Sequence, residues 1–454
     1  MKMNFKYVML ACATLMAGFT SCSNEENLDG AEIIPNGKAT VAEIVLTQQA
    51  NSTRAISLSS TPTAAESVIN KATLYIFNAS KRLVKQVDFA PTTNVKTVEL
   101  TTGTHYFHAL VNHPGTAPVF SANSTLAAVT AHLNNEIPLT NIGFITTGPS
   151  GFLMSTLGDP VAKNLVEATE AEAATKNPVE LKVGRAMAKL KTLFEATDRA
   201  TQQPATGVLG NVKYQGANNP NKMYALPNYV GTQLEAPYFT TYSDPNVVDQ
   251  TKYFPTLPGD FTMTTGWVNA DGAESNIVYL VENSNKTPKE GNSTFVLLKG
   301  TFSPEATYCY NGADGTELGS AIPTGTTFWC AATADKKIVY KKKFFNSAPT
   351  SAVLAALTTN LNDGNTYTEI IEYNNGEAYY AFFLQDELQS TRVAKFTTAR
   401  NNYYGVTINS VSDLGANTPK GVVPDKETPL GAKAWVQGTI TILNWSTVTQ
   451  TGGI

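Results

Sequence analysis

Short runs in which apolar and polar residues alternate recur along the whole chain, and they predict an all-β protein. Residues 39–47 are rich in β-branched side chains, and residues 71–78 alternate between two faces. A period of two is typical of strands, and turn residues separate one run from the next. Further runs of this kind lie at 81–87, 97–100, 105–112, 179–183, 293–300, 337–342, 378–384, 403–411 and 434–449. Their spacing predicts β-sandwiches of short antiparallel strands.

Two stretches favour helix, and one of them suggests a domain boundary. They are residues 125–137 and the Ala- and Glu-rich residues 160–175, which end before Pro178. We therefore expect an N-terminal domain over 55–176 and a C-terminal domain over 177–454 that opens with the strand at 179–183. A chain of 454 residues is long enough for two cores. The stretch 200–350 is rich in Asn, Pro, Tyr and Thr, which favours loops and hairpins.

The last run of the chain changes its phase. Val436, Gly438, Ile440 and Ile442 share one face, but from Leu443 onward Leu443, Trp445 and Thr447 take the apolar positions. One phase shift indicates a bulge, or two segments that serve different sheets. A last strand with a bulge near its end fits the pattern. A donor strand at about 436–454, which continues into a neighbouring molecule, fits it equally.

The first 22 residues have the pattern of a lipoprotein signal peptide. Lys2 and Lys6 precede an apolar stretch at 8–19, which is too short to span a bilayer core. The small residues Thr20 and Ser21 then stand directly before Cys22, the expected site of lipid attachment. An ordinary secretory signal with an incidental cysteine is the alternative. Residues 23–54 follow as a propeptide that begins with a short acidic tether.

A lone arginine lies just after the first predicted strand. The sequence around it is Asn51-Ser52-Thr53-Arg54-Ala55, a Ser/Thr-rich setting that suits proteolysis. A cut between Arg54 and Ala55 would remove the strand at 39–47 from the rest of the chain. A β-protein that loses a strand has an open position, which invites a strand from another molecule.

Charge and cysteine content exclude several classes of protein. Charged residues make up 15% of the chain and the net charge is −4, so no nucleic-acid footprint is visible. Of the four cysteines, Cys12 lies in the signal and Cys22 would carry lipid. Cys309 and Cys330 remain, and the sequence permits either a disulfide or a buried unpaired couple.

No catalytic, metal or cofactor site can be assembled from the sequence, so we do not expect an enzyme. His105 and His108 lie three apart on a predicted strand and therefore point to opposite faces. The aspartates lack a spacing that would pair carboxylates for acid–base work. Trp267 and Trp329 suit either buried anchors of a sandwich or a sugar-binding platform.

Several stretches, in order, resemble the fimbrillins, the type V pilins of gram-negative anaerobes. They are GKATV (37–41), NSTRA (51–55), ATLYIFN (72–78), RAMA (185–188), ARNNYYGVTI (399–408) and Trp445 in the last strand. The resemblance implies two transthyretin-like β-sandwich domains with strand exchange between subunits. It also implies a lipoprotein precursor at the outer membrane and a mature form in cell-surface fimbriae.

The resemblance further implies how such a subunit assembles. An arginine-specific protease would cut after Arg54, and the C-terminal strand of another copy would fill the vacated position through Ile440, Ile442, Leu443 and Trp445. The partners would be other copies in a head-to-tail filament, anchor and tip pilins, and a host or bacterial receptor. The alternatives are a tip or accessory adhesin of the same fimbria and a glycan-binding surface lipoprotein that keeps its lipid.

Overall fold

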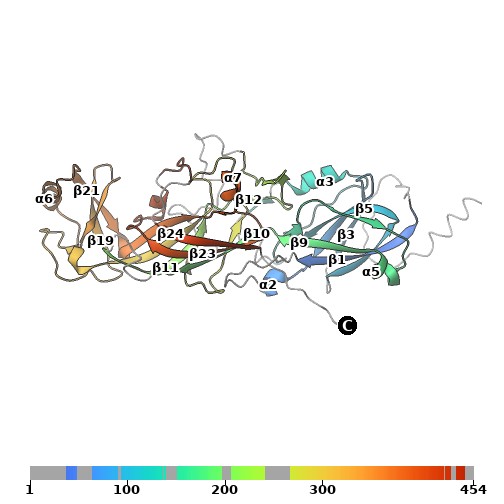
Figure 1. Cartoon of the computed structure of the whole chain (residues 1–454), viewed down its shortest axis with the longest axis horizontal. Helices are drawn as coiled ribbons and strands as arrows, with labels where there is room; N and C mark the ends of the chain where they lie inside the picture. The colour runs from blue at the N-terminus through green and yellow to red at the C-terminus, as the bar shows by residue number, and fades with distance from the viewer. Residues whose placement is uncertain are drawn as a thin grey trace, which may run out of the picture.

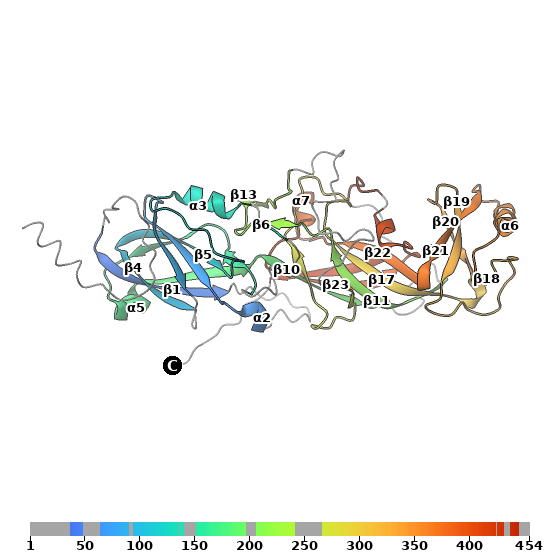
Figure 2. The same cartoon turned by 180° about the vertical axis from the view of Figure 1, so that it is seen from behind.

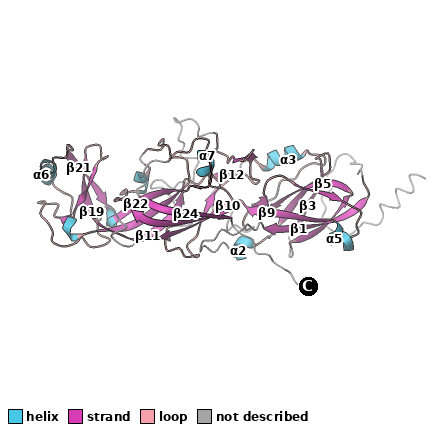
Figure 3. Ribbon diagram, viewed as in Figure 1, coloured by secondary structure: helices cyan, strands magenta, loops and turns pink. Residues whose placement is uncertain are grey.

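β-Strands dominate the computed structural model, which describes residues 37–48, 64–89, 94–135, 137–139, 151–196, 206–240, 266–423, 425–430 and 436–444 (Figure 1). The predicted all-β class is confirmed, because the helices are few and short (Figure 3). The described chain is elongated, with β1 (Ala39–Gln48) toward one end and α6 (Ser351–Leu361) at the other (Figures 1 and 2).

The first sheet has eight strands in the order β3-β2-β5-β7-β9-β1-β4, with β8 paired to β5. Its remaining strands are β2 (Ala72–Phe77), β3 (Leu83–Phe89), β4 (Val95–Thr101), β5 (Gly103–Val111), β7 (Met154–Thr156), β8 (Val161–Leu165) and β9 (Pro178–Arg185). All six residues of β2 are buried, so this strand is covered on both faces. Predicted strands at 39–47, 71–78 and 105–112 thus match β1, β2 and β5.

Two four-stranded sheets follow and enclose a second core. One runs β16 (Val278–Val281), β10 (Met187–Phe194), β23 (Asn402–Val411), β24 (Val436–Asn444), and the other runs β15 (Val268–Asn269), β11 (Gly207–Ala217), β17 (Phe295–Pro304), β22 (Glu377–Phe383). Leu190 and Val406 from the one sheet, and Tyr214 and Leu298 from the other, belong to the same buried cluster. This pair of sheets is therefore a sandwich.

A third four-stranded sheet lies at the far end of the molecule, beside α6 (Figure 2). Its order is β18 (Cys309–Tyr310), β20 (Val339–Phe345), β19 (Phe328–Thr333), β21 (Tyr367–Tyr373). Two two-stranded pairs complete the strands: β6 (Ile137–Pro138) with β12 (Lys222–Met223), and β13 (Tyr229–Val230) with β14 (Gln233–Leu234). The other helical elements are α2 (Ala64–Ser67), α3 (Leu126–Leu133), α5 (Ala173–Lys176), α7 (Arg392–Lys395), and the 3₁₀ turns η1 (Glu170–Glu172), η3 (Ala306–Tyr308), η4 (Asn374–Gly376) and η5 (Pro419–Val422).

The two large cores meet between Met187 and Ala188. Met187 still belongs to the first buried cluster, whereas Ala188 belongs to the second. β9 pairs with β1 and β7, so it lies in the first sheet and does not open the second domain as the sequence suggested. The alternation at 179–183 is real, but its inward residues Val179, Leu181 and Val183 fill the first core. The proposed division of the chain into 55–176 and 177–454 stays a prediction in other respects.

The helix predictions are partly right. The stretch 125–137 contains α3, which Thr125 caps by accepting a hydrogen bond from the Ala128 amide. The stretch 160–175 is wrong in its first half, because Val161–Leu165 forms β8 against β5 and helical turns begin only at Glu170. Helix propensity is weak beside an available sheet neighbour. α6 was not predicted.

Candidate functional site

β1 lies inside the first sheet, between two strands that differ in direction. It pairs antiparallel with β4, where Ala42 faces Val98, and parallel with β9, where Leu46 faces Leu181. The strand also makes a backbone hydrogen bond outside these two pairings, in which the Leu46 amide donates to the Asn94 carbonyl at 2.8 Å. We call the position between β4 and β9 the β1 site. Loss of β1 would leave both neighbouring strands with an unpaired edge.

The inward face of β1 is apolar in its middle. Ala42, Ile44 and Leu46 are at most 1% exposed and belong to the first core. The residues between them are half-buried, as expected for a strand with one face on the core. Burial of such side chains gives about 1.5–3 kcal/mol for each large one, so these positions supply much of the affinity of the site for a strand.

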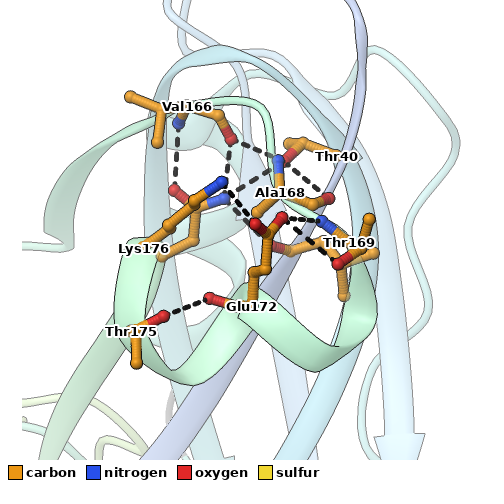
Figure 4. A network of polar contacts seen from close by, with 9 residues as sticks. Thr40, Val166, Ala168, Thr169, Glu172, Thr175 and Lys176 are labelled. Carbon is orange, nitrogen blue, oxygen red and sulfur yellow. Dashed lines mark hydrogen bonds and ion pairs between the residues drawn. The ribbon is translucent and has the colours of Figure 1, made fainter.

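A polar network holds the first inward residue, Thr40 (Figure 4). The Thr40 hydroxyl donates to the Val166 carbonyl at 2.6 Å and accepts from the Ala168 amide at 3.0 Å. It also accepts from the buried Asn177 Nδ2 at 3.1 Å. The Asn177 amide group donates further to the Val41 carbonyl at 2.9 Å, so one side chain bonds both the backbone and the side chain of β1.

The turn that carries this network is itself fixed by short-range hydrogen bonds. The Thr169 amide donates to Glu172 Oε2 at 3.1 Å, and Lys176 Nζ lies 2.7 Å from Glu172 Oε1. The hydrogen bond from Lys176, followed by that from the Thr169 amide, lowers the pKa of Glu172 to about 2. Glu172 therefore stays charged well into the acidic range, and the turn presents Ala168 and Asn177 to Thr40.

The last inward residue, Gln48, meets a buried arginine at the opposite end. Arg185 Nη2 donates to Gln48 Oε1 at 2.8 Å, and Gln48 Nε2 donates to the Ser67 carbonyl at 2.8 Å. Arg185 is 1% exposed, and burial lowers its pKa to about 10, which still leaves the guanidinium charged at neutral pH. The β1 site is therefore polar at both ends and apolar between them.

The Arg185 end connects the β1 site to the second sandwich. Arg185 Nε donates to the Glu66 carbonyl at 2.8 Å, and the Arg185 amide donates to Asn401 Oδ1 at 3.1 Å, next to β23. The buried Lys189 on β10 pairs with Glu66 at 3.3 Å, and Tyr279 donates to the same carboxylate at 2.6 Å. Removing one partner of such a buried pair would leave an uncompensated charge, which is strongly destabilising.

Several predicted site residues lie outside the described part of the chain: Cys22, Arg54, Ala55 and Trp445. Their roles stay predictions. In sequence, Arg54 falls between Gln48, where β1 ends, and Ala64, where α2 begins.

The other predicted site residues, Ile440, Ile442 and Leu443, lie on β24. This strand pairs antiparallel with β23 and forms the last strand of its sheet. Ile440 is half-buried and packs against the second core. Pairing runs without a shift from Gly438 to Asn444, and the irregularity lies between Ile408 and Ser410 of β23. Trp445 and Thr447, which carry the new phase after Leu443, lie outside the described residues, so both interpretations of the phase change stay predictions.

Outside the β1 site, the cysteine, histidine and tryptophan side chains that could react or bind a ligand have structural roles. Cys309 and Cys330 are both buried free thiols, so the disulfide that the sequence permitted is not formed. His108 is buried with Nδ1 2.8 Å from Thr156 Oγ1. Trp267 packs against Tyr379 and Lys299. Within the described ranges no group of three metal-binding side chains occurs, and no helix there has the length and apolarity to cross a membrane.

The sequence carries a signal for the polar ends of the β1 site. Gln48 stands in phase with Ala42, Ile44 and Leu46, and Arg185 stands in phase with the inward series of β9 that ends at Val183. A polar residue that ends an inward series is a candidate for a buried contact. Thr40, which begins the inward series of β1, carries the same signal. Asn177 carries none, because its contact with Thr40 joins segments far apart in the chain.

Comparison with known proteins identifies one region by sequence. The family model described as major fimbrial subunit protein type IV, fimbrillin, C-terminal, matches residues 371–451. Among curated proteins, none matches the chain.

Solved structures resemble the chain over most of its length. A fimbrilin from Porphyromonas gingivalis W83 has 14% identity and a TM-score of 0.48, with 90% of this chain and 99% of that chain covered. The tip fimbrial protein Mfa3 from Porphyromonas gingivalis, with C-terminal truncation, has 13% identity and a TM-score of 0.40, with 89% of this chain and 100% of that chain covered.

Proposed function

The chain belongs to the fimbrillin family through its C-terminal region, and from that premise we propose that it is a structural pilin subunit of a surface fimbria that supports adhesion. The family is structural, so no catalytic step is part of the proposal. Assembly would proceed by donor-strand exchange, in which β1 leaves and the C-terminal strand of another copy takes its place.

The observation that carries the proposal is the position of β1. It pairs with a strand on each side and buries Ala42, Ile44 and Leu46, yet only residues 49–63 connect it to α2. A cut after Arg54 falls in that connection. An internal strand that one cut can separate is what strand replacement requires, since main-chain hydrogen bonds then provide the strength and side-chain pockets the specificity.

Processing before exchange follows from the order of the signals in the sequence. Lipidation at Cys22 would carry the precursor to the outer membrane, and an arginine-specific protease would then release residues up to Arg54. The mature chain would begin at Ala55 without lipid. Because the lipidated Cys22 lies upstream of the cut, anchoring and polymerisation exclude each other in one subunit.

The donor in this scheme is the C-terminal strand with Ile440, Ile442, Leu443 and Trp445. Among the described strands β24 lies at the edge of its sheet, next to β23, so it can leave or be extended without splitting the sandwich. Acceptor and donor lie in different sheets of one subunit. The resulting contact is head-to-tail and does not close, so it propagates as a filament. Anchor and tip pilins would end the filament, and the surface would offer a receptor contact.

The test is to block processing and count filaments. Arg54→Ala should leave a folded monomer that keeps its lipid and forms no filaments by electron microscopy, whereas wild-type protein shed from cells should begin at Ala55. Arg82→Ala is the matched control, because Arg82 is an exposed arginine on the turn before β3, and it should assemble normally. Normal filaments from Arg54→Ala would overturn the proposal. A lipid-blocked N-terminus at Cys22 in all surface protein would favour a glycan-binding lipoprotein instead.

A further inference from the structure

The residues around the β1 site favour particular side chains on any strand that fills it. Its middle accepts small and branched apolar side chains at the positions of Ala42, Ile44 and Leu46. At the junction end Arg185 donates to Gln48 from a buried position. A hydrogen bond to a charged, buried donor is costly to leave unmade. Arg185 Nη2 also reaches Ser67 Oγ, at 3.5 Å. A strand with a side-chain acceptor at its fifth inward position keeps the shorter of these two contacts and is therefore favoured.

One nine-residue segment of this chain has side chains of this kind. It is β24, which is as long as the stretch from Thr40 to Gln48. Read at alternate residues in the same chain direction, the two segments correspond in approximate size, and in polarity from the second pair onward. The corresponding pairs are Val436 with Thr40, Gly438 with Ala42, Ile440 with Ile44, Ile442 with Leu46, and Asn444 with Gln48.

We propose that Arg185 selects and registers the incoming strand, and that β24 of a second copy occupies the β1 site with Asn444 as the acceptor for Arg185. This inference rests on the proposed strand exchange and specifies its register. A shift by one residue would turn Ile440 and Ile442 outward. A shift by two would either put Ile442 against the guanidinium or move Asn444 into the apolar middle of the site, at the position of Leu46.

Backbone pairing favours the transfer. Among the described strands, β24 pairs in its own sheet with β23, whereas a strand in the β1 site pairs with both β4 and β9. Ile440 is half-buried on the second core, while Ile44, its counterpart, is fully buried. The donor therefore gains a neighbour and gains burial at that position.

At the other polar end of the site, the resident strand and its replacement differ in the hydrogen bonds that they can make. Thr40 offers the hydroxyl that bonds Val166, Ala168 and Asn177, whereas Val436 has the same shape without a hydroxyl. The resident β1 is thus the better ligand of the two. That difference adds to the effect of the covalent connection in keeping the uncut precursor closed.

A cysteine pair tests the register directly. Thr47 faces Lys182 of β9, and in the proposed alignment Leu443 takes the place of Thr47. A chain with Leu443→Cys and Lys182→Cys should, once cut after Arg54 and oxidised, give a ladder of covalent multimers on a non-reducing gel. Thr441→Cys with Lys182→Cys is the control, because a two-residue offset moves the pair apart by about 6.6 Å and prevents bonding. Cross-linking of the control in place of the first pair would overturn the register.

Variants of Asn444 test the role of Arg185. Asn444→Leu should lower the rate of filament growth after cleavage roughly tenfold or more, the effect of losing a hydrogen bond to a charged group. Asn444→Gln keeps the acceptor and should restore most of that rate. Thr441→Val, at an outward position in the alignment, should have little effect. Thermal unfolding of the uncut precursors should be similar, since Gln48 still occupies the site.

The failures of the two proposals can be told apart. If cut wild-type protein forms no filaments, strand exchange itself is wrong. If it forms them, and Asn444→Leu grows as fast as wild type or Asn444→Gln fails to restore growth, exchange stands and the role of Arg185 is wrong.

Discussion

The clearest consequence of an exchangeable β1 is that weakening this strand should speed assembly. Ile44 is fully buried and packs in the first core, so Ile44→Ala removes buried methyl groups and leaves a cavity. Such a change costs about 2–5 kcal/mol of folding free energy in well-packed cores. Urea unfolding of the uncut precursor, followed by circular dichroism, should show this loss.

The effect on filaments should have the opposite sign. Residues up to Arg54 are absent from the proposed mature chain, so the Ile44→Ala precursor gives a product identical to wild type after cleavage. Only the affinity of the departing strand changes. At about 2 kcal/mol, the lower end of the range, β1 is held roughly 30-fold more weakly. Filament growth that waits on release of β1 should accelerate by up to that factor, as light scattering after addition of an arginine-specific protease would report.

Leu181→Ala is the matched control. Leu181 is as fully buried as Ile44 and lies on β9, the neighbour of β1 that stays in the mature subunit. Its loss should destabilise the precursor to a similar extent, but it damages the site for the incoming strand as well. Growth should then be no faster than wild type. If Ile44→Ala slows assembly as Leu181→Ala does, β1 is not the strand that leaves.

Three further predictions concern the polar end, a buried histidine and the thiols. Thr40→Val should lower the free energy of unfolding of the precursor by about 1–2 kcal/mol in urea, and Thr40→Ser by much less, because only the hydroxyl bonds Asn177. Burial lowers the pKa of His108 from 6.5 to about 4; between these values the unfolded chain binds a proton that the folded chain does not, so stability should fall as pH falls from 6.5 to 4, and His108→Gln should flatten that slope. Burial also raises the pKa of both Cys309 and Cys330, so iodoacetamide should modify them only in denaturant, as mass spectrometry would show.

Local sequence patterns predicted the positions of the strands well, but not which strands pair with one another. β1, β2 and β23 lie within two residues of their predicted positions, because alternation with β-branched and aromatic residues is a local signal. The stretch 160–175 was predicted as helix from its Ala and Glu content, yet β8 forms there because β5 offers a free edge. That edge is created by residues far away in the chain.

The same distinction applies to the candidate site. The strand at 39–47 and the lone Arg54 could be found from the sequence, but the pairing of β1 with both β4 and β9 could not. The alternation of β9 is visible in the sequence, but the strand was expected to open the second domain, whereas it pairs with β1 and β7. The crossing from the first core to the second occurs inside one continuous run, between Met187 and Ala188, and alternation alone does not mark it. Asn177 and Arg185 acquire their roles only through that arrangement.

Cleavage in the proposed scheme changes no contact of β1; it changes the concentration at which β1 competes for its site. While residues 49–63 connect β1 to α2, the strand rebinds as an intramolecular ligand, at an effective concentration far above its bulk concentration. After a cut at Arg54 it competes only at its bulk concentration. Diluting the cut precursor should therefore promote release of β1, and an excess of a synthetic peptide of residues 38–54 should stop filament growth. A peptide with Gln48→Leu should be a weaker inhibitor, because it cannot accept from Arg185. If dilution leaves β1 bound and added peptide leaves growth unchanged, proteolysis must act through a conformational change in the mature subunit, and the tether argument is wrong.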